Sequence, residues 1–539
     1  MTTERRLLLA LVAACLVLFS FQIGNHDFWD PDEPRYAGVA RNILESGDWI
    51  RLTDNGEPYT QKPPLYFWML AAATKLGGGL NESSARIPAG AAGLLCVAAV
   101  YRFGKRLFNS RVGWLSAMTL ATSQRFFVEA RWVHMDTLLT LFVVLSMESA
   151  HAALRGSRRN WLWMYGWMAL GCLVKGPLGF ALPVAGVLVY LASSRELTRL
   201  NESGWFWGIP LCLLPVSLWL LASSRLSGID PGAVVSRQVF QRLQEGVHHP
   251  RPFYYYFYSL PLEFLPWTLF LPSALRFTLP AVRGRGRGSL LFVYGWIVGN
   301  LALLSLIVEK RPSYLLPVFP ALALLVGSFF DDFLTRYDAS EMKRWIQWPI
   351  ALGGIVCLAG TLYLANRGVA FAGLRERIVP LGLFLGVLCT GALWFQHRGR
   401  RGATLLTLLA GISLGYLWIV GAIFPWLDQY KSARPFCERI LSHSDEGPLG
   451  IYGDYLPAFA YYTHRRLQVV RTPIGLDALI GSAPGAACIV PKEKLVALQA
   501  VVPLEVLDAE SIGHRSFVLV GGVPGEANPP RPHAGNSPR

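Results

Sequence analysis

The sequence predicts a polytopic all-α membrane protein that ends in a small C-terminal α/β domain. Of its 539 residues, 53% are hydrophobic and only 16% are charged, a composition far from that of a soluble globular protein. Apolar runs long enough to cross about 30 Å of hydrocarbon recur from Leu7 to near Phe424. We therefore expect a transmembrane domain over 1–427, a C-terminal domain over 428–523 and a disordered tail over 524–539.

The apolar runs predict thirteen membrane spans. They lie near 7–23, 85–103, 112–129, 136–153, 161–174, 178–193, 205–223, 257–275, 289–308, 313–330, 346–365, 378–395 and 403–422. The first run has Arg5 and Arg6 before it and no small-residue cleavage site after it, so we expect it to remain as a span. The short apolar segment from Pro63 to Leu76 begins with two prolines and is expected at the membrane interface.

Clusters of Lys and Arg set the expected orientation. With thirteen spans, the clusters at 105–111, 155–159, 195–199, 283–287, 343–344 and 398–401 all fall in connections on one side. This matches the excess of positive charge in cytoplasmic loops, and it explains the net charge of +15 without nucleic acid as a partner. The N-terminus is then cytoplasmic and the C-terminal domain lies on the opposite face.

Polar side chains gather in the loops that this topology places outside. They are Asp30, Asp32, Glu33, Arg35, Tyr36, Tyr59 and Lys62 in the first outer loop (24–84), followed by Asp136, Lys175, His248, His249, Lys310, Arg311 and Tyr314. Such groups are costly next to hydrocarbon and mark a functional cavity. Snorkelling explains single cations, but not their acidic neighbours.

The first loop carries the carboxylates. Asp30, Asp32 and Glu33, next to Arg35, are suited to accept a proton, bind a divalent cation or balance a cationic substrate group. Two structural alternatives stay open: Asp32 as the cap of the helix predicted after it, and a local structural role for Asp30.

Cations suited to a lipid phosphate occur in two places. Lys62 stands before the stiff pair Pro63-Pro64, and Lys310 and Arg311 are followed by the Tyr314 hydroxyl. The alternative is that Tyr314 belongs to an aromatic belt and Lys310 anchors the topology.

Two further features combine acidic, basic or metal-binding side chains. Asp136 begins an apolar span and needs a cation, for which Lys175 is the candidate; an ion pair for packing alone competes with a functional role. His248 and His249 could ligate a divalent metal together with a loop carboxylate, although we favour ordinary loop histidines.

After Asp428, short β-like runs alternate with pieces compatible with helices. The strand candidates are LGIYG, RLQVV, AACIV and SFVLV, and the helix candidates are PAFAYYTH, LDALIG and KLVALQAVV. This alternation predicts the α/β domain.

Six stretches resemble the bacterial aminoarabinose transferases and the protein O-mannosyltransferases, within the GT-C superfamily of membrane glycosyltransferases. They are WDPDEPRYAGVARNILESGDWI, YTQKPPLYFW, ARIPAGAAGLLCVAAVYRFGKRLF, ARWVHMDTLLT, LVKGPLG and KRPSYLLPVFP. The resemblance implies transfer of a sugar, such as 4-amino-4-deoxy-L-arabinose, from undecaprenyl phosphate to lipid A or a related acceptor. The reaction would be an inverting single displacement on the periplasmic side of the bacterial inner membrane.

The resemblance also implies roles for particular residues. Asp32 matches the family's essential first-loop aspartate, Lys62 and Tyr314 match the residues that hold the carrier phosphate, and Asp136 and Lys175 match other polar positions of the site. With Glu33 added, the catalytic candidates are Asp32, Asp136 and Glu33; the substrate-binding candidates are Lys62, Tyr314, Lys310, Arg311, Arg35, Tyr36, Tyr59 and Lys175. Gln61 stands where the aminoarabinose branch often has glutamate, which puts a metal at that position in doubt.

Two alternatives to this function are transfer to a Ser or Thr hydroxyl of an exported protein, with Asp32 as general base, and a transporter or flippase for a lipid-linked sugar. The concentration of polar groups at one face argues against the transporter.

Overall fold

The computed structural model describes residues 3–236, 250–282, 287–335, 340–366, 372–444 and 447–523. The chain divides into two compact units. The helical unit comprises Met1–Asn25, Ile43–Leu52 and Pro58–Trp426, and the sheet unit comprises His26–Asn42, Thr53–Glu57 and Leu427–Arg539. Part of the first polar loop therefore groups with the C-terminal residues.

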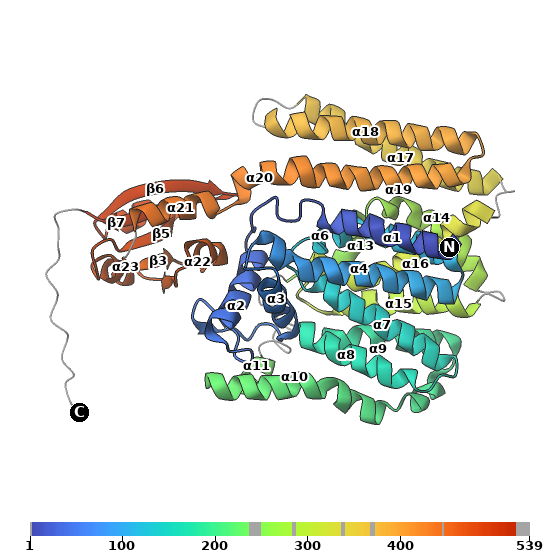
Figure 1. Ribbon diagram of the computed structural model, residues 1–539, viewed down its shortest axis with the longest axis horizontal. Coiled ribbons are helices and arrows are strands. Elements are labelled where there is room, and N and C mark those ends of the chain that lie inside the picture. The colour runs from blue at the N-terminus through green and yellow to red at the C-terminus, as the bar shows by residue number, and fades with distance from the viewer. Residues whose placement is uncertain are drawn as a thin grey trace. The chain divides into compact units, whose positions relative to one another are not determined.

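Long apolar helices build the helical unit (Figure 1). Its α-helices are α1 (Thr3–Ser20), α3 (Leu65–Leu76), α4 (Glu82–Leu107), α5 (Ser110–Ala121), α6 (Gln124–Glu129), α7 (Asp136–Leu154), α8 (Asn160–Lys175), α9 (Leu178–Ser194), α10 (Trp205–Ser227), α11 (Pro231–Val235), α13 (Tyr255–Glu263), α14 (Leu271–Val282), α15 (Arg287–Leu306), α16 (Phe319–Thr335), α17 (Ser340–Ala365), α18 (Ala372–His397), α19 (Arg401–Trp418) and α20 (Phe424–Lys431), the last of which runs into the sheet unit. The 3₁₀ segments are η1 (Leu197–Ser203), η3 (Trp267–Phe270) and η4 (Pro312–Val318), and η6 (Ile419–Ile423) is a π-helical turn.

The chain is a multi-pass membrane protein. Within the described ranges, eight helices are long and apolar enough to cross a bilayer, and α3 and α9 are shorter apolar helices. The predicted span at 178–193 corresponds to the shorter helix α9. The predicted spans at 7–23, 112–129, 161–174 and 257–275 correspond neither to the eight long helices nor to the two shorter ones. Charged residues begin α1, α8 has only 16 residues, and the other two runs are interrupted between α5 and α6 and between α13 and α14.

Helix packing brings the ends of distant segments together. In the helical unit, α7 packs against α8, α9 and η4, while α8 also packs against α9 and α10. A second group is formed by α17, α18 and α19, in which α18 packs against both α17 and α19 (Figure 1). The first group positions the polar side chains described below.

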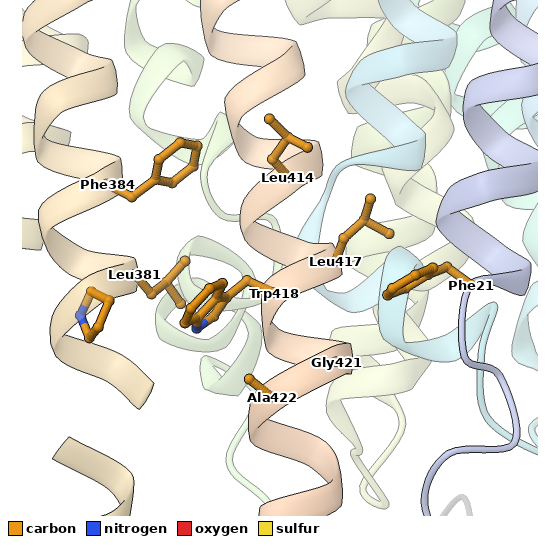
Figure 2. A pocket seen from close by; sticks show the side chains of 9 residues that line it. Phe21, Leu381, Phe384, Leu414, Leu417, Trp418, Gly421 and Ala422 are labelled. Carbon is orange, nitrogen blue, oxygen red and sulfur yellow. The ribbon is translucent and has the colours of Figure 1, made fainter. Parts of the chain in front are cut away.

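An apolar hollow of about 540 Å³ lies beside the π-helical turn η6. Figure 2 shows Phe384 and Leu381 of α18 on one side, with Leu414, Leu417 and Trp418 of α19 and Phe21 across from them. Gly421 and Ala422 of η6 complete the labelled wall. Walls of this composition suit hydrocarbon and disfavour charged groups.

The sheet unit contains a five-stranded mixed sheet with the order β4-β3-β5-β7-β6. Its strands are β3 (Leu449–Tyr452), β4 (Gln468–Val470), β5 (Ala487–Pro491), β6 (Leu504–Ile512) and β7 (Arg515–Gly522). β3 runs parallel to β4 (Gly450↔Gln468) and to β5 (Gly450↔Cys488), whereas β7 is antiparallel to β5 and β6.

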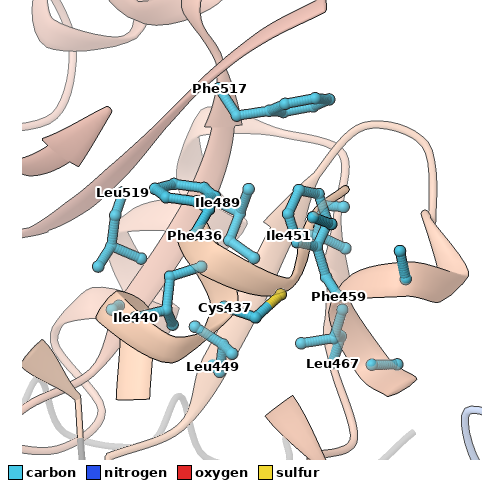
Figure 3. Packing of buried hydrophobic residues seen from close by; sticks show 14 residues of the cluster. Phe436, Cys437, Ile440, Leu449, Ile451, Phe459, Leu467, Ile489, Phe517 and Leu519 are labelled. Carbon is cyan, nitrogen blue, oxygen red and sulfur yellow. The ribbon is translucent and has the colours of Figure 1, made fainter. Parts of the chain in front are cut away.

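Helices cover the sheet and complete the unit. They are α21 (Arg434–His443), α22 (Pro457–Thr463), α23 (Pro473–Ile480) and α24 (Lys492–Gln499), and α2 (Asp32–Ser46) belongs to the unit up to Asn42. The short strands β1 (Thr53–Asp54) and β2 (Glu57–Pro58) pair with each other. Figure 3 shows the core formed by Phe436, Cys437 and Ile440 of α21 against Ile451, Ile489 and Leu519 of the strands.

The predicted C-terminal domain with strands and helices is confirmed as a mixed-sheet domain, and all four predicted strands and all three predicted helices are present. The strand β6 was not predicted, because its burial does not follow a clean alternation and a bulge lies between Val506 and Asp508. The tail at 524–539, predicted to be disordered, lies outside the described residues.

Candidate functional site

A buried ion pair in the helical unit joins two of the predicted site residues. Asp136 is the first residue of α7 and Lys175 the last of α8, and Lys175 Nζ lies 2.5 Å from Asp136 Oδ1. The two side chains are only 9% and 5% exposed. Because a lone charge here would be costly, the sequence predicted this pairing, and the structure confirms it.

Local backbone geometry places Lys175 at this position. Gly176 ends α8 with a φ of +64°, a conformation that glycine adopts without strain. The following helix, α9, approaches α8 closely, since a Cβ built on Gly171 would lie 3.0 Å from the Cα of Gly179. Substitution of any of these glycines would shift the end of α8 and its lysine.

Tyr314 lies against the same ion pair. Its ring centroid is 4.3 Å from Lys175 Nζ, and its hydroxyl lies 3.5 Å from Glu309 Oε1 at the limit of a hydrogen bond. The structure thus brings Asp136, Lys175 and Tyr314 together from α7, α8 and η4. We name these three residues the ion-pair triad.

The segment before Tyr314 is held by backbone contacts. Glu309 forms a β-bridge with Pro250, and the Arg251 N–H donates to Val308 O at 3.1 Å. The Lys310 ammonium donates to the carbonyl oxygens of Arg251, at 3.2 Å, and Ile307. Burial lowers the pKa of Lys310. Lys310 therefore holds the segment around Ile307 against the segment around Arg251. The next residue, Arg311, is only partly buried.

Sequence reasoning missed a second charged network, on and beside α6. Arg125 Nε donates to Glu263 Oε2 at 2.6 Å, and its guanidinium lies 3.5 Å from Glu129 Oε1. The fully buried Glu129 also bonds His134 Nδ1 at 2.6 Å. Glu129 acts electrostatically on Lys175, and Asp136 acts on Arg125. In the sequence, this network is indicated by the spacing of four residues between Arg125 and Glu129 within a mostly apolar segment.

Lys62 and Tyr59 precede α3. Lys62 is partly exposed and is followed by Pro63 and by Pro64, which caps α3. Tyr59 is buried, with its ring 5.5 Å from that of Phe67 and its N–H bonded to Leu52 O at 2.8 Å. Tyr59 therefore stiffens the backbone that presents Lys62.

In the sheet unit, Asp30 caps a helix from a distance in sequence. Its Oδ1 accepts a hydrogen bond of 3.0 Å from the N–H of Ala458, in the first turn of α22. Burial raises the pKa of Asp30 to about 6, against the opposing effects of that hydrogen bond and of Arg35. The structural role that the sequence left open for Asp30 is thus present.

Asp32 and Arg35 belong to a more open charged group. Arg35 lies 4.0 Å from Asp32 Oδ1 and 3.6 Å from Asp54 Oδ2, with Asp32 and Arg35 about one-fifth exposed. The Tyr455 hydroxyl donates to Asp54 Oδ1 at 2.9 Å. Sequence reasoning did not single out Asp54 or Tyr455, which are remote in sequence. Asp32 is the first residue of α2, where a carboxylate favours the helix.

The other two first-loop candidates are buried. Glu33 is 2% exposed and its Oε2 accepts a hydrogen bond of 3.3 Å from the Trp29 N–H. Tyr36 is 6% exposed. Glu33 therefore shapes the turn that leads into α2.

The metal candidates His248 and His249 fall outside the residues that the structure describes. In the part of the chain that is described, no group of three or more His, Cys, Asp or Glu side chains is placed to hold a metal ion.

The chain is similar in sequence to known proteins. Residues 61–221 match the family model described as dolichyl-phosphate-mannose-protein mannosyltransferase. A Pseudomonas paraeruginosa protein named undecaprenyl phosphate-alpha-4-amino-4-deoxy-L-arabinose arabinosyl transferase is 30% identical, over 77% of this chain and 74% of its own. A protein of the same name from Edwardsiella ictaluri is 28% identical, over 74% and 73% of the two chains.

The fold is that of a solved relative. The crystal structure of ArnT from Cupriavidus metallidurans bound to undecaprenyl phosphate superposes with a TM-score of 0.79 and 21% identity, covering 97% of this chain and 99% of the other. Together with the 30% identity above, this shows that the chain belongs to the ArnT family of aminoarabinose transferases, which are polyprenyl-phosphate-dependent GT-C membrane glycosyltransferases related to the protein mannosyltransferases.

Proposed function

We propose that this enzyme transfers 4-amino-4-deoxy-L-arabinose from undecaprenyl phosphate to lipid A. The names of the relatives support the donor and the sugar. The acceptor follows from the resemblance to the aminoarabinose branch, whose nucleophile is an ionised phosphate oxygen. The observation that carries the proposal is the ion-pair triad, because a cation and a phenol held at helix ends suit a lipid phosphate.

The proposed chemistry is a single displacement with inversion. A phosphate oxygen of the acceptor attacks the anomeric carbon, and the bond from that carbon to the carrier phosphate breaks. The carrier leaves as undecaprenyl phosphate with the bonding electrons. We assign its stabilisation to Lys62, Tyr314 and Arg311, with Lys175 adding positive charge.

The carboxylates have supporting roles in this scheme. Because the nucleophile is already ionised, Asp32 orients the acceptor or the amino sugar instead of removing a proton, with Arg35, Glu33 and Tyr36 shaping its surroundings. Tyr59 supports the backbone that presents Lys62. Asp136 keeps Lys175 charged and oriented.

The membrane topology is part of the proposal. Thirteen spans, with a cytoplasmic N-terminus, place the sheet unit in the periplasm of a bacterium and the site residues at the periplasmic face of its inner membrane. The Lys and Arg clusters between apolar runs support this orientation. Cysteine labelling of Arg35→Cys and Arg158→Cys in intact cells tests it, since only the first should react with an impermeant reagent.

Lys62→Ala is the direct test of the site. Purified enzyme in detergent is given lipid A and undecaprenyl phosphate carrying radiolabelled aminoarabinose, and transfer is followed. We expect Lys62→Ala to reduce kcat by about a thousandfold without changing the melting temperature. Lys75→Ala, which removes an exposed lysine from the other end of α3, is the matched control and should retain activity. Near-normal transfer by Lys62→Ala would remove Lys62 from the site.

A Ser or Thr hydroxyl is the second candidate acceptor, favoured by the match of residues 61–221 to the protein mannosyltransferase model. A hydroxyl nucleophile needs a general base, for which Asp32 is the candidate. Supplying a Ser/Thr-containing peptide in place of lipid A distinguishes the two acceptors, because only one should become labelled.

A further inference from the structure

A crevice in the sheet unit opens at the carboxyl ends of β3 and β5. The chain leaves β3 through α22 toward β4, on one side in the sheet order, and leaves β5 through α24 toward β6 and β7, on the other. Adjacent parallel strands whose connections diverge in this way form a topological switch point. In open α/β sheets, ligands bind in the crevice outside such a point.

The crevice has the size and the chemistry of a small-ligand site. Its volume is about 570 Å³, within the usual range for small-molecule pockets. Its polar lining consists of Asp454 after β3, Lys492, Glu493 and Lys494 in the first turn of α24, and His514, Arg515 and Ser516 at the start of β7. Tyr452 and Phe517 supply aromatic surface. Three elements therefore contribute to one concave surface.

The two lysines of the crevice have no counter-ion in the part of the chain that the structure describes. Lys492 and Lys494 form no ion pair there, although Asp454 and Glu493 line the same crevice, whereas Arg515 acts electrostatically on Asp30. This contrasts with Arg439 of the same unit, which is paired with Asp508 at 2.6 Å and Glu510 at 2.9 Å. The crevice thus presents positive charge that remains available to a ligand.

Lys494 reaches across the crevice to β3. Its Nζ lies 5.5 Å from the centroid of the Tyr452 ring. Gly453, with a φ of +93°, leaves the backbone bare at this point, and a Cβ there would lie 3.7 Å from Lys494 Nζ. The first turn of α24 follows Pro491, whose side chain has no oxygen to cap it, so its N–H groups add to the positive potential.

We propose that this crevice, whose lining includes none of the transferase candidates, binds a phosphorylated saccharide. Lys492, Lys494 and the first turn of α24 receive the phosphate. Asp454, Glu493 and Ser516 accept hydrogen bonds from sugar hydroxyl or amino groups. The same chemistry is presented by a soluble sugar phosphate and by the head group of a phosphorylated glycolipid.

Calorimetric titration of the full-length protein in detergent with α-D-glucose 1-phosphate tests the site. We expect saturable binding, weakened about tenfold or more in Lys494→Ala and in Lys492→Ala, because each loses one charged contact. Arg466→Ala is the matched control: it removes one exposed cation just before β4, outside the crevice lining, and should bind within about twofold of wild type.

Several outcomes would overturn the proposal. These are no saturable binding to the wild type, equal weakening by Arg466→Ala, or inorganic phosphate binding as tightly as glucose 1-phosphate, which would leave a plain anion site. Competition then distinguishes a soluble ligand from a glycolipid head group. If nanodiscs containing lipid A displace glucose 1-phosphate, the ligand is a glycolipid head group. If they do not, the ligand is a soluble sugar phosphate. Lys62→Ala should bind the probe normally, so loss of transfer and loss of binding are distinguishable.

Discussion

The same kinds of charged side chain are held differently in the two units. In the helical unit, Lys175 and Asp136 lie 2.5 Å apart with less than one-tenth of each side chain exposed. In the sheet unit, Arg35 lies 4.0 Å from Asp32, with about one-fifth of each side chain exposed. Water can replace a lost partner in the second case but not in the first. Burial, more than charge, should therefore decide what each pair contributes to stability.

The largest effect is expected from breaking the buried pair. Asp136→Leu leaves the Lys175 ammonium without its counter-ion and should lower the free energy of unfolding by about 3–5 kcal/mol. Adding Lys175→Met removes the stranded charge and should recover most of that loss. The double-mutant cycle is measured by denaturant unfolding in micelles. A loss below about 1 kcal/mol in Asp136→Leu would show that water reaches the pair and would break the comparison.

The next effect concerns Asp30, a partly buried carboxylate within the otherwise more open unit. Its pKa of about 6 in the folded protein lies above the ordinary value of 3.8, so folding takes up a proton between these pH values. Stability should therefore fall as pH rises from about 4 to about 6, by roughly 3 kcal/mol at most. Asp30→Asn keeps an oxygen for the Ala458 N–H and should remove this dependence. Denaturant unfolding at pH 4 and pH 7 measures the difference, and identical pH profiles for the two proteins would contradict it.

The pairing of Asp136 with Lys175 could be predicted from sequence because an unpaired charge in an apolar span is so costly. The same reasoning located the short helix α3 from its two prolines and four strands of the sheet from their apolar runs. Each of these features leaves a local pattern or a large energetic penalty in the sequence.

Other features depend on contacts between distant segments. Asp54 and Tyr455 are separated by 401 positions, so neither residue carries a local sign of their hydrogen bond. The interruption at Thr122 and Ser123, between α5 and α6, contains no proline or glycine and falls within the mostly apolar run 112–129. Composition alone treats such a run as one helix. The Arg125–Glu129 network depends on Glu263, which only the folded chain brings to α6.

A smaller effect is expected at the hydrogen bond from Tyr455 to Asp54. Burial raises the pKa of the Asp54 carboxyl, and the hydrogen bond from the Tyr455 hydroxyl opposes that rise. Tyr455→Phe removes this hydroxyl. We expect a loss of about 1–2 kcal/mol at pH 7 and a smaller loss at pH 4, where Asp54 is closer to neutral. Melting temperatures at the two pH values are compared with those of Tyr430→Phe, a half-exposed tyrosine of the same unit. Equal losses for both variants would place Asp54 in water and weaken the argument from burial.

The smallest effect tests the other end of the comparison. Arg466 and Glu57 lie 3.2 Å apart, closer than Arg35 and Asp32, but their side chains are 67% and 75% exposed. If burial governs the contribution, Arg466→Ala should change the free energy of unfolding by no more than about 0.5 kcal/mol, and added salt should reduce even that. Denaturant titrations at low and high ionic strength measure it. A loss above about 1 kcal/mol would mean that the distance between the two charges matters more than the exposure of their side chains. The contribution of the Asp136–Lys175 pair to the free energy of unfolding would then come from its short distance and not from its exclusion from water.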